Sequence, residues 1–199
     1  MKKQVVVIHG GRTFNTYKEY IKSLKGRKVS IDSFETHKTW RYSLDVNLGK
    51  NYQLLVPKMP NSNNAVYYEW KIWFEKMNPF IKNNVILIGH SLGGIFLAKY
   101  LSENKYKKKI KALILVAAPF DDCEKESLRS FTLPKSLDKL SNQCKDIYLI
   151  FSKDDPVVPI KEIKKYESVL PHSKLIIFRS KNHFIQDDFP ELVKIIKNL

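Results

Sequence analysis

The chain has 199 residues, of which 43% are hydrophobic and two are cysteines, so it is long enough to bury a core without disulfide staples. Cys123 and Cys144 form no C-x-x-C pair and no metal-like spacing, so we expect no disulfide framework, no metal site and a reducing, cytoplasmic location. The start reads as a first strand and not as a signal peptide, and no apolar stretch approaches the roughly 18 residues of a membrane span.

The formal net charge is +15, and a basic surface can attract nucleic acid, anionic lipid or acidic substrates. Only five of the basic residues are arginines, although arginine is the side chain suited to bidentate phosphate contacts. The densest lysine run, 105–111, only connects a predicted helix to a predicted strand. We therefore interpret the charge as a composition bias spread over solvated faces and expect no specific nucleic-acid partner.

Apolar strand-like and helix-like segments alternate through the first half of the chain. A polar connection that contains aromatic residues separates the first helix from the second strand, and Pro57 and Pro60 end that strand. Aromatic residues at helical spacing before Met77 predict a helix that packs on a sheet. In chain order the expected elements are strand 5–8, helix 16–24, strand 53–56, helix 66–77 and strand 85–88.

The second half continues the alternation after an irregular, polar segment, 119–144, which contains Pro119 and Pro134 and is the expected excursion over the site. Nearly continuous apolar strands separated by helices predict an α/β fold with a mostly parallel central sheet and helices on both faces. No repeat or linker interrupts the pattern, so we expect a single domain, 1–199. The expected elements are helix 95–101, strand 112–117, strand 147–151, helix 160–170, strand 175–178 and helix 189–197.

The run from Val85 to Gly94 leads an apolar strand directly into G-x-S-x-G, with Ser91 at its centre. Such a serine lies on a sharp strand-to-helix turn, where glycines are needed because backbones approach closely. The five-residue pattern alone occurs by chance, but the strand before it and the helix after it supply the expected context. Ser91 is therefore the candidate nucleophile.

A serine hydroxyl needs a base to take its proton and a third group to orient that base. Asp154 and Asp155 follow one predicted strand and His183 follows the next. Because the carboxyl ends of parallel strands meet at one edge of a sheet, these side chains are expected to converge with Ser91. His183 is the candidate base; the adjacent carboxylates leave two choices for the acid.

The oxyanion of an acyl-transfer intermediate needs backbone N–H donors fixed in advance. The N–H of Leu92, directly after the nucleophile, also lies at a helix start, where N–H groups are free. The loop His9-Gly10-Gly11-Arg12 offers the second donor, the N–H of Gly11. Arg12 is placed to touch an acidic substrate group, although an ordinary exposed arginine is the simpler interpretation.

Together these residues resemble the α/β-hydrolase superfamily, and more narrowly its small serine hydrolases related to retinoblastoma-binding protein 9. The resemblance covers the chain in order and rests on Gly89-His90-Ser91, Asp154-Asp155-Pro156, His183-Phe184 with Glu191-Leu192, and the segment 68–74 downstream of Met59-Pro60. It implies a three-layer fold with a minimal lid and the order nucleophile, acid, histidine.

The family's pattern Gly-x-x-Asp, followed by aliphatic residues and proline, aligns with Ser152 to Asp155 and favours Asp155 over Asp154 as the acid. Asp154 is then expected to be a turn residue in solvent. Members commonly carry glycine at the positions of Ser152 and Asn182. Asparagine tolerates left-handed backbone, so the second departure is mild.

The resulting hypothesis is a serine hydrolase that cleaves a small carboxylic ester through an acyl-enzyme, with thioesters and amides as less favoured substrates and no metal or organic cofactor. The pocket is expected to be open and shallow, with Phe14, Trp40 and Phe120 as candidate walls, although ordinary packing is the simpler role for each. The alternative is a non-catalytic binding or interaction protein on the same scaffold, because fold does not fix function.

Overall fold

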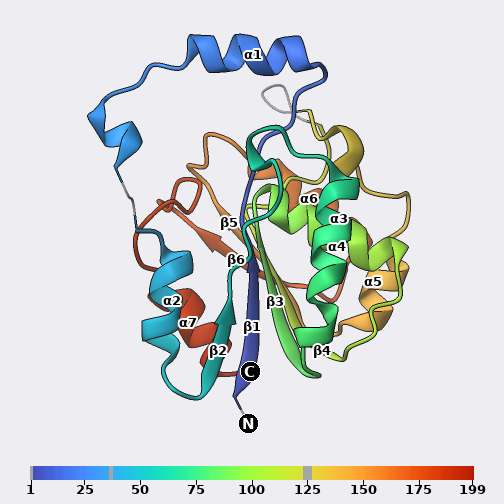
Figure 1. Cartoon of the computed structure of the whole chain (residues 1–199). Coiled ribbons are helices and arrows are strands. Elements are labelled where there is room, and N and C mark those ends of the chain that lie inside the picture. The colour runs from blue at the N-terminus through green and yellow to red at the C-terminus, as the bar shows by residue number, and fades with distance from the viewer. Residues whose placement is uncertain (1, 36–37, 123–126) are drawn as a thin grey trace.

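The computed structural model describes residues 2–35, 38–122 and 127–199 (Figure 1). Its strands are β1 (Lys3–Ile8), β2 (Tyr52–Leu55), β3 (Val85–His90), β4 (Ile110–Val116), β5 (Ile147–Ser152) and β6 (Lys174–Phe178). Its α-helices are α1 (Tyr17–Gly26), α2 (Trp40–Leu48), α3 (Tyr67–Met77), α4 (Leu92–Glu103), α5 (Asp138–Gln143), α6 (Lys161–Val169) and α7 (Pro190–Lys197).

The six strands form one sheet in the order β2-β1-β3-β4-β5-β6, and every neighbouring pair is parallel. This confirms the predicted α/β fold with a parallel sheet. From β1 the chain moves outward to β2 and then returns to add β3 on the other side, so the strand order reverses between β1 and β3. In open α/β sheets such a reversal leaves a crevice at the carboxyl ends of the strands, where ligands bind.

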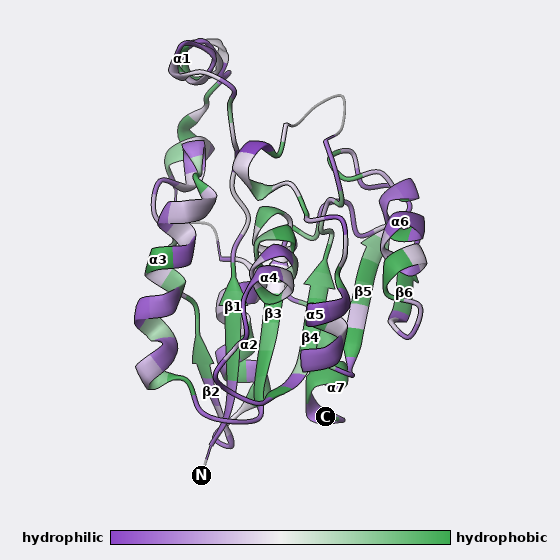
Figure 2. Cartoon of the chain, turned by 90° about the vertical axis from the view of Figure 1, so that its right-hand side faces the viewer, coloured by the Kyte–Doolittle hydropathy of each residue, from purple (hydrophilic) through white to green (hydrophobic). Residues whose placement is uncertain are grey.

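Helices cover both faces of the sheet because successive strand residues point to opposite sides. Val6 and Ile8 face one core, which α3, α4, α5 and α6 complete, whereas Val5 and Val7 face the other, which α2 and α7 complete. The strands are accordingly apolar along their length (Figure 2). The three-layer architecture expected from the resemblance is therefore confirmed.

Helix α2 was missed by the sequence analysis, which treated its residues as part of a polar connection. Its buried side chains, Trp40, Leu44 and Leu48, recur every four residues, which is the signature of a helix with one apolar stripe. The expected first helix forms as α1, but none of its residues is buried, and it lies apart from the sheet (Figure 1). The first helix to cover the sheet is therefore α2.

The segment 119–144 also differs from expectation, because none of its described residues lines the pocket that Ser91 lines. Leu128, Phe131 and Leu137 are buried in the same core as α4, and the short helix α5 follows them. These hydrophobic residues are held in the core, where their burial is favourable.

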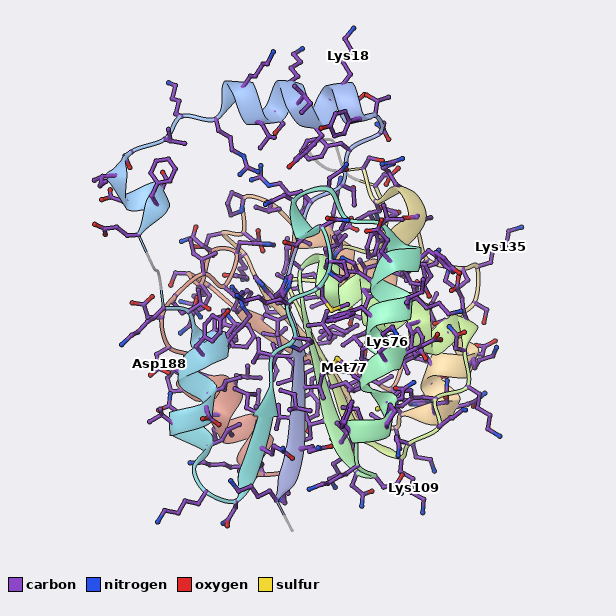
Figure 3. All side chains as sticks on the ribbon, in the orientation of Figure 1. Lys18, Lys76, Met77, Lys109, Lys135 and Asp188 are labelled. Atoms are coloured by element: carbon purple, nitrogen blue, oxygen red, sulfur yellow. The ribbon has the colours of Figure 1, made fainter. Side chains whose placement is uncertain are left out.

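The surface carries lysines on many elements, as the exposed Lys18, Lys76, Lys109 and Lys135 illustrate (Figure 3). Within the part of the chain that the structure describes, no helix has both the length and the apolar character needed to cross a bilayer.

We predict that Gly93→Ala destabilises the protein by about 2–4 kcal/mol, because overpacking a site that cannot yield is costly. A Cβ at Gly93 would lie 2.3 Å from the Ile8 carbonyl oxygen and 2.6 Å from that of His9. Urea unfolding measures the loss. Gly26→Ala is the control: a Cβ there meets nothing within 4 Å, so stability should rise slightly, by less than about 1 kcal/mol. Equal effects of the two substitutions would contradict the proposed crowding.

Candidate active site

Ser91 lies at the sharp turn between β3 and α4, as predicted. Its backbone has φ 54° and ψ −123°, a strained conformation for a non-glycine residue. The Ser91 N–H donates to the Val116 carbonyl, 2.8 Å away, which ties the turn to β4. Gly89 permits the turn, because a Cβ there would lie 2.4 Å from the Gly93 carbonyl oxygen. The sharp strand-to-helix elbow expected from G-x-S-x-G is therefore present.

His183 and Asp155 are paired. The His183 Nδ1 lies 2.9 Å from Oδ2 and 3.1 Å from Oδ1 of Asp155, whose side chain is 1% exposed. The same carboxylate accepts the backbone N–H groups of Val157 and Val158, at 2.8 and 3.0 Å. A carboxylate fixed in this way selects the tautomer with hydrogen on Nδ1, so that Nε2 of His183 is left free to accept a proton.

Asp154 does not contact His183, but it is more than a turn residue in solvent. Its Oδ1 accepts hydrogen bonds from the Ser152 hydroxyl and from the backbone N–H groups of Lys181 and Asn182. The Ser152 hydroxyl is the main reason that the pKa of Asp154 is lowered. Asp154 therefore ties the loop after β5 to the loop after β6, and Ser152 takes part in this link.

The loop that carries His183 has an unusual backbone on both sides of the imidazole. Asn182 has φ 47° and Phe184 has φ 52°, and for a residue as bulky as phenylalanine this conformation is strained. Trp40 holds the loop in place: its indole N–H donates to the Phe184 carbonyl at 2.8 Å, and its backbone N–H donates to Gln186. The helix that the sequence analysis missed thus fixes the loop of the candidate base.

His90 and Arg41 form a second set of contacts that holds the His183 loop. The His90 Nε2 lies 2.8 Å from the His183 carbonyl oxygen, and the His90 Nδ1 lies 3.2 Å from Nη1 of Arg41. An arginine N–H can only donate, so Nδ1 accepts and Nε2–H donates, which requires a neutral imidazole. Burial is the largest cause that lowers the pKa of His90 well below its ordinary value, and electrostatic interaction with His183 and Arg41 lowers it further. The ring of His90 faces this network, away from the nucleophile.

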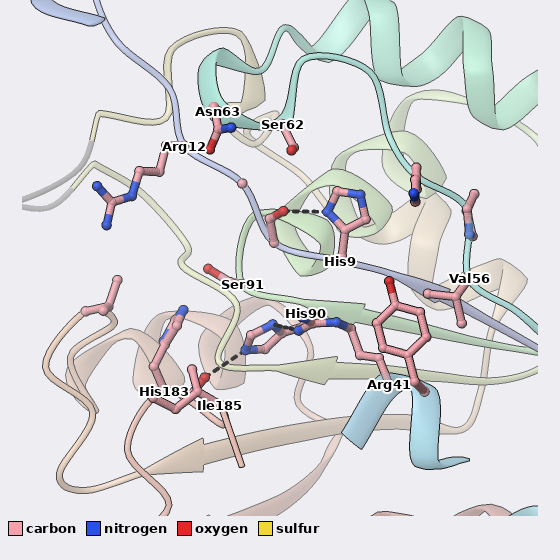
Figure 4. A pocket seen from close by; sticks show the side chains of 16 residues that line it. His9, Arg12, Arg41, Val56, Ser62, Asn63, His90, Ser91, His183 and Ile185 are labelled. Carbon is pink, nitrogen blue, oxygen red and sulfur yellow. Dashed lines mark hydrogen bonds between the residues drawn. The ribbon is translucent and has the colours of Figure 1, made fainter. Parts of the chain in front are cut away.

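Ser91 and His183 line the same pocket, and Figure 4 shows the Ser91 hydroxyl and the His183 ring facing its interior. Among the described residues no hydrogen bond joins the Ser91 Oγ to His183. Catalytic hydrogen bonds are often long in ligand-free enzymes and tighten when substrate binds. The structure thus brings the three side chains to one edge of the sheet and pairs two of them.

The two expected oxyanion donors lie beside Ser91. A Cβ at Gly10 would be 3.1 Å from the Ser91 Cβ, so the loop after β1 passes directly over the elbow. In the hydrogen bonds recorded for residues 2–35, 38–122 and 127–199, no acceptor pairs with the backbone N–H of Gly11 or of Leu92. Both groups are available to a ligand.

The pocket has a volume of about 360 Å³. None of the three aromatic residues expected as walls lines it. Trp40 is fully buried beneath the His183 loop, Phe120 packs on Tyr166, and Phe14 packs on Tyr20. The lining residues are His9, Gly10, Gly11, Arg12, Arg41, Tyr42, Val56, Pro57, Lys58, Ser62, Asn63, His90, Ser91, Val157, His183 and Ile185.

His9 is the lining residue that ties the pocket wall to the oxyanion loop. Its Nε2 accepts the Met59 N–H at 2.8 Å, so its Nδ1 carries the hydrogen and donates to the Gly10 carbonyl. Burial is the main reason that the pKa of His9 is lowered. Among the described residues no group of three or more His, Cys, Asp or Glu side chains is placed to hold a metal. Cys144 is buried, and Cys123 lies outside the described residues.

Comparisons with known proteins agree with the motifs. A family described as serine hydrolases matches residues 32–192. The serine hydrolase RBBP9 of Rattus norvegicus is 30% identical over an alignment of 151 residues, which covers 74% of this chain and 78% of that protein.

Two solved structures show a similar fold. The ydeN gene product of B. subtilis aligns with a TM-score of 0.71 and 21% identity over 99% of this chain and 98% of its own. An esterase, EaEST, from Exiguobacterium antarcticum aligns with a TM-score of 0.62 and 16% identity over 98% and 91%. The α/β-hydrolase fold is thereby confirmed.

We predict that the network around His90 makes stability depend on pH near neutrality. Because the folded state lowers the pKa of His90, this imidazole binds a proton near pH 6.5 in the unfolded chain but stays unprotonated at that pH in the folded protein. Stability is therefore full above about pH 6.5 and falls below it, by at most about 1.4 kcal/mol per pH unit. The free energy of unfolding in urea is measured for the wild type and for His90→Gln. The difference between the two values should shrink by about 1 kcal/mol from pH 7.5 to pH 5.5.

The control for this measurement is His172→Gln, at an exposed position outside the network. Its pH dependence should follow that of the wild type. A difference between wild type and His90→Gln that stays constant over this range would contradict a neutral, buried His90.

Proposed function

Because this chain belongs to the serine hydrolase family, we propose that it cleaves carboxylic esters with Ser91 as nucleophile, His183 as general base and Asp155 as the group that orients His183. The observation that carries the proposal is the Nδ1–carboxylate pair of His183 and the buried Asp155, in the pocket that Ser91 also lines. Thioesters and amides remain the other substrate classes.

In the first half of the proposed reaction the Ser91 Oγ bonds to the acyl carbon while its proton passes to His183 Nε2. The carbonyl electron pair moves to oxygen, and the N–H groups of Gly11 and Leu92 donate to that oxyanion. When the intermediate collapses, the bond from the acyl carbon to the alcohol oxygen breaks and His183 returns the proton to the leaving alkoxide. The imidazolium that forms in between is stabilised by Asp155.

In the second half a water molecule attacks the acyl-enzyme and gives its proton to His183 Nε2. The tetrahedral intermediate then expels the Ser91 oxygen, which takes the proton back, and the carboxylic acid leaves. No group outside the chain is consumed except water. An ester is the less demanding substrate, because an alkoxide is a better leaving group than the amide anion that an unprotonated amide would expel; in either case the proton held by His183 goes to the leaving group. 4-Nitrophenyl esters of graded acyl length test the substrate class.

We predict that a fluorophosphonate probe labels the wild type and not Ser91→Ala, which should also lose at least about 10⁴-fold in kcat on a 4-nitrophenyl ester. Ser62→Ala is the matched control, because Ser62 lines the same pocket but has no role in the proposed chemistry, and it should still be labelled. Labelling of Ser91→Ala would contradict the assignment. A folded wild type that is neither labelled nor active would favour the non-catalytic binding protein.

We predict that Asp155→Asn lowers kcat by about 10³–10⁴-fold, because the amide no longer selects the required tautomer of His183 or stabilises its protonated form. Asp154→Asn is the matched control and should cost less than about tenfold, since Asp154 contacts backbone N–H groups and the Ser152 hydroxyl. Kinetics on one 4-nitrophenyl ester, with circular dichroism to verify folding, compare the two. The reverse ranking would move the acid to position 154.

A further inference from the structure

Among the described residues, the pocket beside Ser91 is lined by three cationic side chains, Arg12, Arg41 and Lys58, and by no carboxylate. The acid of the site, Asp155, is buried and paired with His183, so it is not available to neutralise them. Lysines are scattered over the whole surface, but arginines are scarce, and two of the five in the chain lie here. The pocket is therefore richer in arginine than the lysine-dominated surface around it.

Arg41 is the cation whose position is hardest to explain by folding alone. It is partly buried in the first turn of α2, where the positive end of the helix dipole disfavours another positive charge. Among the ion pairs of the described residues, none includes Arg41. Burial lowers the pKa of its guanidinium, which nevertheless stays protonated at physiological pH.

The contacts of Arg41 leave most of its hydrogen-bonding capacity unused. Its Nη1 donates to the neutral His90 ring at 3.2 Å, and its guanidinium lies 5.8 Å from the centre of the Trp40 ring. A guanidinium carries five N–H donors in a planar fork that matches a carboxylate. Figure 4 shows the side chain reaching from α2 to His90, next to Ser91.

We infer that this pocket binds esters that carry an anionic group, a carboxylate in the simplest case, and that Arg41 contacts that group. The inference rests on the proposed function and specifies its substrate class. A bound carboxylate would supply the counter-charge that the protein itself does not give Arg41, while the exposed Arg12 and Lys58 would attract the anion to the pocket. The alternative is that Arg41 only positions His90.

Two pairs of esters test the inference, and within each pair the members differ by one charge. In the first pair, 4-acetoxybenzoate and its methyl ester, the carboxylate is on the alcohol part. In the second pair, the mono-4-nitrophenyl ester of adipic acid and the corresponding methyl 4-nitrophenyl diester, it is on the acyl part. The readout is the ratio of kcat/KM for the anionic ester to that for the neutral one, in the wild type, Arg41→Gln, Arg41→Lys and Arg27→Gln.

We predict that the wild type favours the anionic member of at least one pair by tenfold or more, and the pair that shows it identifies the side that carries the anion. Arg41→Gln should lower this ratio about tenfold, the loss expected for one charge-assisted hydrogen bond, and Arg41→Lys should retain part of it. The exposed Arg27, outside the pocket, is the control, and its substitution should leave the ratio unchanged.

Equal turnover of both members of each pair by the wild type would overturn the inference and leave the hydrolase intact. A uniform loss for both members in Arg41→Gln would do the same and would assign Arg41 to positioning His90. A protein that hydrolyses none of the four esters, and that no fluorophosphonate labels, would contradict the proposed function and this inference with it.

Discussion

The backbone of the loop after β6 is the constraint on which the site depends. The loop presents His183 between two residues with left-handed φ, Asn182 and Phe184, a conformation that costs of order 1–3 kcal/mol for each non-glycine residue. Two hydrogen bonds to successive carbonyls oppose that cost: His90 donates to the oxygen of His183, and Trp40 donates to that of Phe184. The Phe184 ring is also fully buried against Phe189.

At the turn that carries Ser91, close packing likewise compensates for a strained backbone. Ser91 holds an unfavourable φ because β3, β1 and the start of α4 approach so closely that Gly93 has room for no side chain. The close approach brings the loop after β1 against Ser91 and Leu92, since a Cβ at Gly10 would lie 3.1 Å from the Ser91 Cβ and one at Gly11 would lie 3.1 Å from the Leu92 side chain. His9 stabilises this loop by bridging the Gly10 carbonyl and the Met59 N–H. The fold thus fixes the loop that carries Gly11 relative to the start of α4 without any ligand.

The sequence predicted the parts of this arrangement that have local signals. Each of Ser91, Asp155 and His183 follows an apolar strand, and parallel strands deliver their ends to one edge, so their convergence needed no coordinates. Phe14, Trp40 and Phe120 pack against other aromatic residues, which was the simpler of the two roles open to them, and none of them lines the pocket. The bonds from Trp40 to Phe184 and from His90 to His183 span 144 and 93 residues, and no periodicity or motif encodes such contacts. The spacing of Trp40, Leu44 and Leu48 was the one available signal for α2.

Helix α2 both supports the backbone of the His183 loop and supplies a positive charge to the pocket. Trp40 and Arg41 are consecutive, and through the indole and through His90 they reach the carbonyls of Phe184 and His183, which are also consecutive. Arg41 is therefore held in the pocket by His90, the same residue whose other ring nitrogen donates to the His183 carbonyl. A net charge of +15 attracts anions to the whole surface but orients none of them, since screening limits such fields to about 10 Å. A guanidinium that is fixed near the His183 loop would hold an anionic group in one place relative to Ser91. A substrate needs such an orientation, whereas a counterion does not.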